Sequence, residues 1–205
     1  MSIMSYNGSA MLAMVGRDCV AIASDTQLSA NGQMISTDFQ RVHMVNNNVM
    51  IGMSGLATDV QTLWADFRAR TKMYKLREER DISPRAFAHM VSSALYQRRF
   101  GPYFIEPVIA GIDPDTKKPY VCSTDIIGCI EKSPNFVVAG TCTENLYGMC
   151  ETLFRPDMDA DDLFETVAQA LVNAFDRDAY SGQGAIVHIL TPTELITRTI
   201  KTRTD

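Results

Sequence analysis

The chain has 205 residues, 46% of them hydrophobic and 21% charged, which is the composition of a folded globular domain rather than of a disordered segment. This length suffices for one sizeable hydrophobic core and predicts a single domain over residues 1–205. The formal net charge of −5, without any long basic run, argues against a nucleic-acid-binding protein.

The first part of the chain predicts strands. Residues 9–15 and 19–24 are apolar runs separated by Gly-Arg-Asp, a sequence that indicates a hairpin turn. Residues 41–45 and 49–54 flank three consecutive asparagines, and asparagine tolerates the left-handed conformations that tight turns need. We therefore expect two pairs of neighbouring strands in this region.

Two helices are expected next. Apolar residues of the first helix fall on one face at helical spacing: Val60, Leu63, Trp64, Phe67 and Tyr74. The second helix is expected to begin at Ser83, whose hydroxyl can cap it, followed by Pro84, which suits a first turn. Its apolar stripe consists of Phe87, Met90, Val91, Ala94 and Leu95.

The second part of the chain predicts strands again, with another helix pair between them. Six strands are expected, at residues 107–112, 119–123, 126–130, 136–139, 185–190 and 195–200. One helix is expected at residues 145–154, and another from about Asp159, whose carboxylate can cap its first turn.

The order of these elements predicts the fold class. Strands come in blocks and helices in pairs, which argues against a parallel doubly wound sheet, where strands and helices alternate. The order favours an α+β fold, in which antiparallel sheets pack together and helix pairs cover the outside. Small residues such as Ala21, Ala23 and Gly52 in the expected strands permit a close approach of the two sheets.

Neither a metal nor a cofactor is expected. The five cysteines are at positions 19, 122, 129, 142 and 150. None of their spacings is that of a zinc ribbon, and the three histidines are distant in sequence, so reduced, buried thiols in a cytoplasmic or nuclear protein are expected. No basic region followed by an apolar stretch suggests a secretory signal, and no apolar run approaches the ~20 residues of a membrane span.

Several sequence motifs occur in order along the chain. They are Cys19-Val-Ala-Ile-Ala-Ser-Asp25, Gly52-Met-Ser-Gly55-Leu-Ala-Thr-Asp59, Cys122-Ser-Thr-Asp-Ile-Ile-Gly-Cys129, Gly140-Thr-Cys-Thr-Glu-Asn-Leu-Tyr-Gly-Met-Cys150 and Asp178-Ala-Tyr-Ser181-Gly182. With these motifs at matching spacing, essentially the whole chain resembles the proteasome beta family, and most specifically its beta-3 type. The resemblance implies the four-layer αββα sandwich of N-terminal-nucleophile hydrolases. It also implies that residues 1–8 are a short N-terminal extension rather than a substantial propeptide.

The resemblance places two altered residues in the active site. In active members of the family, the hydroxyl of an N-terminal threonine attacks the peptide carbonyl, and its own amine serves as general base. Ser9, directly after Gly8, falls at this threonine, where the beta-3 type leads us to expect glycine. Arg41 falls at the lysine that activates the hydroxyl, and a guanidinium cannot give up its proton near neutral pH. We therefore predict that the chain has no catalytic residue of its own.

Four further positions carry over from the family. Asp25 falls at its first aspartate and Gly55 at the glycine whose N–H stabilises the oxyanion. Asp178 and Ser181 fall at the aspartate and serine that orient the site. We expect Asp25, Asp178 and Ser181 to form a buried ion-pair and hydrogen-bond network with the arginine, which fixes loops without catalysing a reaction.

The resemblance also implies partners. It predicts a 28-subunit hetero-oligomer in which two seven-membered beta rings stack between two alpha rings, in the cytoplasm and nucleus. The expected partners are alpha-ring subunits and, within the ring, beta-2 and beta-4 type subunits. The stretch with Asp125 and Cys129 is similar to one that borders the pocket of the trypsin-like beta-2 subunit, where Asp125 would favour a basic substrate side chain. Alternatively, Asp125 merely terminates a strand.

Two other functions stay open at this point. Ser9 retains a hydroxyl, so the chain could be an active N-terminal-nucleophile peptidase once autolysis had removed residues 1–8. An unrelated α+β binding module is the third possibility. The intact mass distinguishes the active peptidase from the non-catalytic subunit, because autolysis would remove residues 1–8. The native size distinguishes the binding module from a ring subunit, because a ring subunit does not remain a 22.8 kDa monomer.

Overall fold

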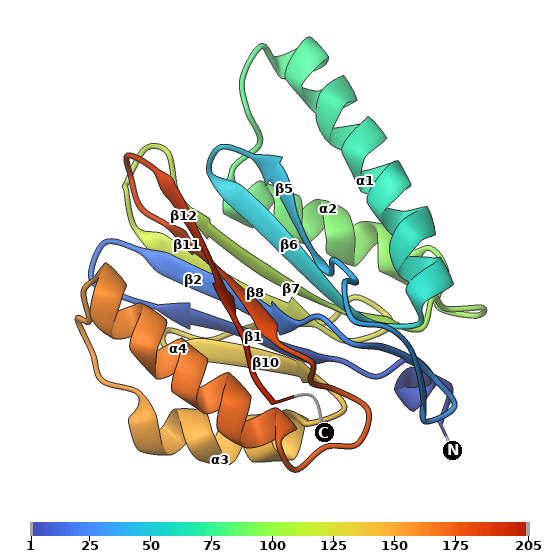
Figure 1. Cartoon of the computed structure of the whole chain (residues 1–205). Coiled ribbons are helices and arrows are strands. Elements are labelled where there is room, and N and C mark those ends of the chain that lie inside the picture. The colour runs from blue at the N-terminus through green and yellow to red at the C-terminus, as the bar shows by residue number, and fades with distance from the viewer. Residues whose placement is uncertain (1, 204–205) are drawn as a thin grey trace.

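Residues 2–203 are described by a computed structural model, in which the elements form four layers (Figure 1). One antiparallel sheet consists, in order, of β10 (Phe136–Gly140), β1 (Ala10–Val15), β2 (Val20–Asp25), β11 (Ala185–Leu190) and β12 (Leu195–Ile200). The other consists of β5 (Val42–Asn46), β6 (Val49–Gly55), β7 (Ile105–Ile112), β8 (Pro119–Thr124) and β9 (Ile130–Lys132). The predicted α+β fold with two packed antiparallel sheets is confirmed.

Helix pairs cover the outer faces of the two sheets (Figure 1). The helices are α1 (Ala57–Glu78), α2 (Pro84–Tyr96), α3 (Thr143–Leu153) and α4 (Ala160–Phe175). The two predicted caps are confirmed, because Ser83 accepts a hydrogen bond from the backbone N–H of Ala86 (3.3 Å), and Asp159 from those of Asp161 and Asp162 (3.1 and 2.9 Å). Each cap satisfies N–H groups that have no partner within the helix.

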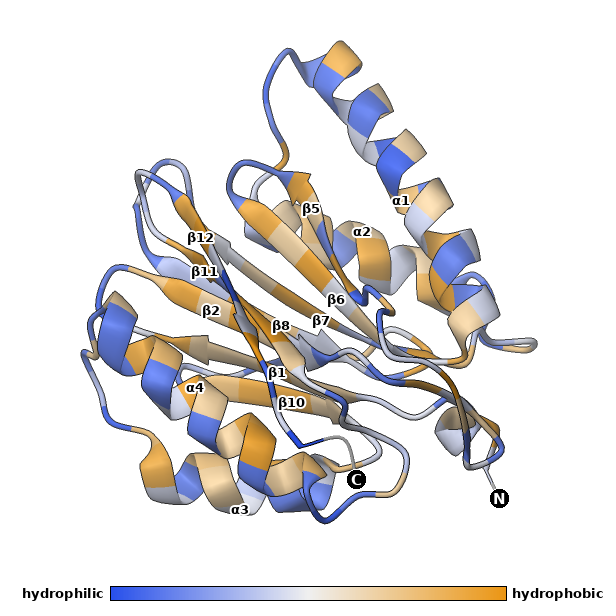
Figure 2. Ribbon diagram, viewed as in Figure 1, coloured by the Kyte–Doolittle hydropathy of each residue, from blue (hydrophilic) through white to orange (hydrophobic). Residues whose placement is uncertain are grey.

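Burial on both faces explains why the central strands are continuous apolar runs. In β1, Leu12 and Met14 pack toward α3 and α4, while Met11 and Ala13 pack between the two sheets. The inner layer is apolar in both sheets, and hydrophobic residues accordingly concentrate in the central strands (Figure 2). Gly52 of β6 lies where an added Cβ would overlap the side chain of Met11, so a small residue there permits the sheets to approach closely.

The observed strands differ from the predicted ones in two main places. A short hairpin of β3 (Leu28–Ala30) and β4 (Gln33–Ser36) was not predicted. The predicted strand at residues 126–130 is wrong: residues 126–129 form a turn, and a strand, β9, begins only at Ile130. The Asp125 carboxylate accepts the N–H groups of Ile127 and Cys129 (3.0 and 2.8 Å), which occupies donors that a strand would use for pairing.

The cysteines also differ in part from the prediction. All five are free, and four are buried, but Cys129 is exposed in the turn that follows Asp125. Burial raises the pKa of the Cys142 and Cys150 thiols to about 12, which keeps them protonated. No group of His, Cys, Asp and Glu side chains within residues 2–203 is arranged to hold a metal ion. In the same range, no helix is both long and apolar enough to traverse a bilayer.

Strand register brings distant parts of the chain to one end of the first sheet. Ala10, at the start of β1, lies opposite Gly140 at the end of β10. Asp25, at the end of β2, lies opposite Ala185 at the start of β11. The residues that immediately flank these four strand ends therefore meet at this end of the sheet, although more than a hundred positions separate some of them in sequence.

Candidate functional site

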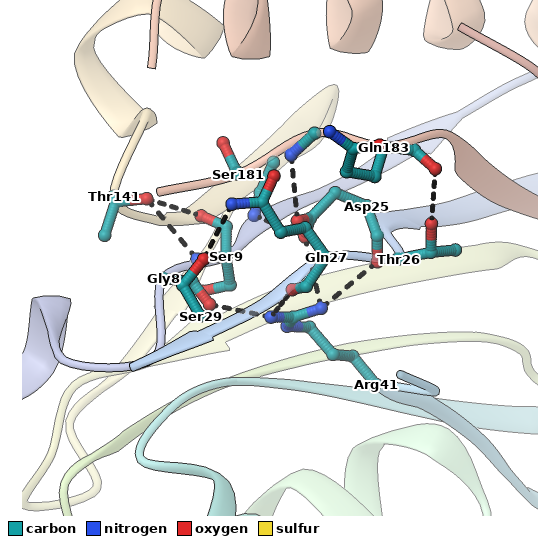
Figure 3. A network of polar contacts seen from close by, with 12 residues as sticks. Gly8, Ser9, Asp25, Thr26, Gln27, Ser29, Arg41, Thr141, Ser181 and Gln183 are labelled. Carbon is teal, nitrogen blue, oxygen red and sulfur yellow. Dashed lines mark hydrogen bonds and ion pairs between the residues drawn. The ribbon is translucent and has the colours of Figure 1, made fainter. Parts of the chain in front are cut away.

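A buried ion pair lies at the centre of this sheet end. Arg41, directly before β5, is 2% exposed, and Asp25, at the end of β2, is 0% exposed. The Arg41 Nη1 lies 3.3 Å from the Asp25 Oδ1, and its Nη2 donates to the carbonyl oxygens of Gly8 (2.7 Å) and Gln27 (2.6 Å) (Figure 3). Nη1 also donates to the carbonyl oxygen of Asp25 itself, at 3.2 Å. A planar guanidinium suits this set of acceptors because its donors are fixed in a fork.

Burial and neighbouring groups shift the pKa values of both members of this pair. Burial raises the pKa of the Asp25 carboxyl, while the Arg41 charge and the backbone N–H groups of Ala10 and Gly182 oppose that rise. These N–H groups lie 2.9 and 3.2 Å from the two carboxylate oxygens. Burial lowers the pKa of Arg41, but a guanidinium remains charged, so Asp25 has a permanent cation beside it.

Ser9, at the predicted nucleophile position, has no activating partner. Its nitrogen is in a peptide bond with Gly8 and donates to Thr141 Oγ1 at 3.3 Å. Its carbonyl oxygen accepts the Thr141 N–H at 2.8 Å. The Ser9 Oγ is buried and has no hydrogen-bond partner within residues 2–203. Within the described part of the chain, the side chain therefore lacks a base that could remove its proton.

Asp178 organises a second polar cluster beside the ion pair. One of its carboxylate oxygens, Oδ2, accepts the hydroxyls of Thr141 and Ser181, each at 2.6 Å. The other oxygen accepts the backbone N–H of Tyr180 at 3.1 Å. Since the next residue after Ser181, Gly182, donates its N–H to Asp25, the two clusters are connected through the backbone.

Gly55, the predicted oxyanion residue, lies at the end of β6 in the second sheet and faces the same region. It lines a hollow of about 330 Å³ together with Ser54, Glu106, Gly140, Thr141, Asp178 and Tyr180. Ser2, Met4 and Ser5 of the N-terminal segment also line this hollow. The structure thus places all six positions carried over from the family in one region.

A second hollow, of about 520 Å³, lies next to the first and contains both Asp125 and Cys129. Its carboxylates are Glu106, Asp125, Glu131 and Glu144. Burial raises the pKa of Glu106, and the negative charge of Asp125 adds to this rise. The hollow is therefore strongly acidic and suits a positively charged group.

Thr141 is the residue of this region that the sequence analysis missed. It joins Ser9 to Asp178, and it lies 132 positions from the first and 37 from the second. Thr141 lies in the motif that begins at Gly140, directly after a predicted strand, but nothing in that motif assigns the threonine a role.

Comparisons with known proteins identify the family of the chain. A protein-family model described as "Proteasome subunit" matches residues 5–190. The chain is 52% identical to the proteasome subunit beta type-3 of Drosophila melanogaster and 54% identical to the proteasome subunit beta type-3-A of Arabidopsis thaliana. It is 50% identical to the probable proteasome subunit beta type-3 of Schizosaccharomyces pombe. Each alignment covers 100% of both chains. The chain therefore belongs to the proteasome subunit family and, within it, to the beta type-3 subunits.

Proposed function

We propose that the polar groups retained at the degenerate site stabilise the fold and do not cleave peptides. The chain is a non-catalytic structural subunit of the 20S proteasome core and takes part in ATP- and ubiquitin-dependent protein degradation as part of that complex. The observation that carries the proposal is the environment of Arg41. This residue stands where catalysis needs a lysine, and its donors are directed to the Gly8 and Gln27 carbonyls and to Asp25.

An electrophilic inhibitor of N-terminal threonines tests this proposal on the assembled particle. We expect the inhibitor to label catalytic subunits and to add no mass to this chain, since no base contacts the Ser9 hydroxyl within residues 2–203 and the donors of Arg41 are directed to carbonyl oxygens and to Asp25. Intact-mass spectrometry measures both the label and the N-terminus, which we expect to retain residues up to Gly8. The labelled catalytic subunits are the internal control. A chain that begins at Ser9, or an adduct on Ser9, would instead support the active peptidase.

We further propose the arrangement in which the subunit works. The chain, as one domain, occupies a seven-membered beta ring between beta-2 and beta-4 type subunits. Two such rings and two alpha rings make a 28-subunit particle in the cytoplasm and nucleus. Native mass spectrometry of the particle and its subcomplexes tests the composition, and cross-linking identifies the two neighbours.

The acidic hollow supports a finer proposal, that Asp125 and Cys129 line the substrate pocket of the adjacent beta-2 type subunit. Three further carboxylates, Glu106, Glu131 and Glu144, surround the same hollow. Such a concentration of negative charge favours a basic substrate side chain and disfavours an acidic one. Asp125 also has the structural role of holding its own turn, so the two roles must be separated experimentally.

Two substitutions at Asp125 separate these roles. Asp125→Asn removes the charge but keeps an oxygen that can accept the N–H groups of Ile127 and Cys129, whereas Asp125→Ala removes both. In assembled particles, we expect Asp125→Asn to lower kcat/KM for a substrate with a basic residue before the cut by about two- to fivefold. Substrates with acidic or apolar residues there serve as controls. If Asp125→Asn has no effect and only Asp125→Ala is defective, the residue acts on the turn alone.

A further inference from the structure

The N-terminal segment contacts the β3–β4 hairpin through two consecutive residues. The carbonyl oxygen of Tyr6 accepts the N–H of Asn31 at 3.0 Å, and that of Asn7 accepts the N–H of Ser29 at 3.2 Å. The Asn7 side chain donates back to the Ser29 carbonyl at 2.8 Å, and Asn7 is 7% exposed. The hairpin is paired with neither five-stranded sheet, so these contacts help to hold it against the rest of the fold.

The same asparagine also reaches the start of helix α1. The N-cap residue of this helix, Leu56, has no side chain that can accept a hydrogen bond. Asn7 Oδ1 accepts the N–H of Ala57 at 2.9 Å, although the two residues are 50 positions apart. Asparagine is among the preferred capping residues because its side-chain oxygen satisfies an N–H that the helix leaves unpaired. Asn7 therefore supplies from outside the helix the cap that the local sequence lacks.

Gly8 makes the third contact, since its carbonyl oxygen accepts Arg41 Nη2 at 2.7 Å (Figure 3). We propose that Tyr6, Asn7 and Gly8 act as a clasp, in which Asn7 is the tertiary N-cap of α1 and connects this helix to the β3–β4 hairpin. In addition to the proposed non-catalytic role of the chain, the segment before Ser9 thus has a function of its own, which is to position helix α1 and the β3–β4 hairpin. Cleavage before Ser9 would remove the α1 cap and one acceptor of the buried arginine.

The rest of the N-terminal segment provides an internal control. Within residues 2–203, the hydrogen bonds of Ser2–Ser5 are made among themselves and with Tyr6. Asn46 provides a second control, because its side chain likewise makes one donated and one accepted bond, to the Ile82 carbonyl (2.9 Å) and from the Asn48 N–H (2.8 Å). It makes these bonds at the β5–β6 turn, away from the clasp.

Amide hydrogen exchange of the full chain tests the clasp. We expect Asn7→Ala to raise the exchange rates of the amides of Ala57, Ser29 and Asn31 by about five- to tenfold. Two control variants, Asn46→Ala and a deletion of residues 2–5, should leave these three exchange rates within about twofold of the rates in the unchanged chain. The clasp is overturned if Asn7→Ala leaves the rates unchanged, or if either control raises them equally.

Asn7→Asp separates the contact with helix α1 from the contact with the β3–β4 hairpin. It can replace Asn7→Ala in the experiment if that variant does not fold. It keeps the oxygen that accepts the Ala57 N–H but replaces the donor to the Ser29 carbonyl with a second acceptor. We expect Ala57 to remain protected while Ser29 and Asn31 exchange faster. Equal loss of protection at Ala57 and in the hairpin would contradict the assignment of Asn7 as the cap of α1.

Discussion

Replacing Arg41 with methionine is expected to lower the free energy of unfolding by about 3–5 kcal/mol, because it leaves the buried Asp25 carboxylate without its cation. The substitution also leaves the carbonyl oxygens of Gly8 and Gln27 without the donor that they have now. Guanidinium chloride unfolding measures the change. The chain's single tryptophan, Trp64, is a suitable probe since it stacks on His43 at 4.6 Å.

The pH dependence of the Arg41→Met variant checks the cause of this loss. Burial raises the folded-state pKa of Asp25 above its usual value even beside Arg41, and loss of the guanidinium removes the largest effect that opposes this rise, so the pKa rises further. A buried carboxyl whose pKa is raised in the folded state destabilises the fold at pH values where it is ionised. The loss of stability of the variant is therefore greatest above the folded-state pKa. The deficit should shrink as the pH falls through the folded pKa toward the unfolded value of about 4.

Two controls accompany this experiment. Arg41→Lys keeps a cation beside Asp25 and should lose less stability than Arg41→Met. The double variant Asp25→Asn/Arg41→Met removes both charges and should also lose less than Arg41→Met alone, since no unpaired charge remains buried. A loss below about 1 kcal/mol for Arg41→Met would be typical of a surface substitution and would show that the ion pair is not a structural centre.

Replacing Gly55 with alanine is expected to cost about 3 kcal/mol of stability, the sum of two effects. Gly55 has φ +111°, a conformation that L residues adopt at a cost of about 1–2 kcal/mol or more. An added Cβ would also overlap the carbonyl oxygen of Phe104, and such overpacking costs about 1–3 kcal/mol. Thermal unfolding of the variant and of the original chain measures the difference.

Gly148 provides the matched control for Gly55→Ala. It is exposed in helix α3, and an added Cβ there meets no atom within 4 Å. Gly148→Ala should therefore raise stability by about 0.5–1 kcal/mol, because alanine loses less backbone freedom on forming a helix. A neutral Gly55→Ala substitution would mean that the backbone at the end of β6 relaxes easily, and the site would then be less rigid than the structure indicates.

The sequence by itself determined the elements whose signals lie in neighbouring residues. The caps at Ser83 and Asp159 were predicted because a capping side chain and the helix that it starts are adjacent in sequence. The strands β11 (Ala185–Leu190) and β12 (Leu195–Ile200) were predicted with the observed bounds. The order of these elements was enough to predict an α+β fold, because apolar faces must be buried against another layer.

Some local signals were nevertheless misread, because side chains compete for backbone donors. Residues 126–130 contain apolar residues typical of a strand, but the Asp125 carboxylate turns the chain there. The three asparagines before β6 do form a turn, but none of them has a positive φ; instead, the Asn46 side chain accepts the Asn48 N–H. At the asparagine turn a side chain, rather than a left-handed backbone, determines the turn. The turn after Asp125 uses both, because Gly128 within it has φ +90°.

Only the tertiary structure determined how the candidate site is held together. The resemblance to the proteasome beta family identified Ser9, Asp25 and Arg41 as site residues. It did not identify the two carbonyl oxygens that Arg41 binds. Thr141 and Asn7 make their decisive bonds across 132 and 50 positions, respectively. No periodicity or local motif encodes such bonds. The Thr141 bond arises because the antiparallel register brings four strand ends together, and the Asn7 bond because the residues before β1 lie against the start of α1. Buried polar groups must find partners in both places.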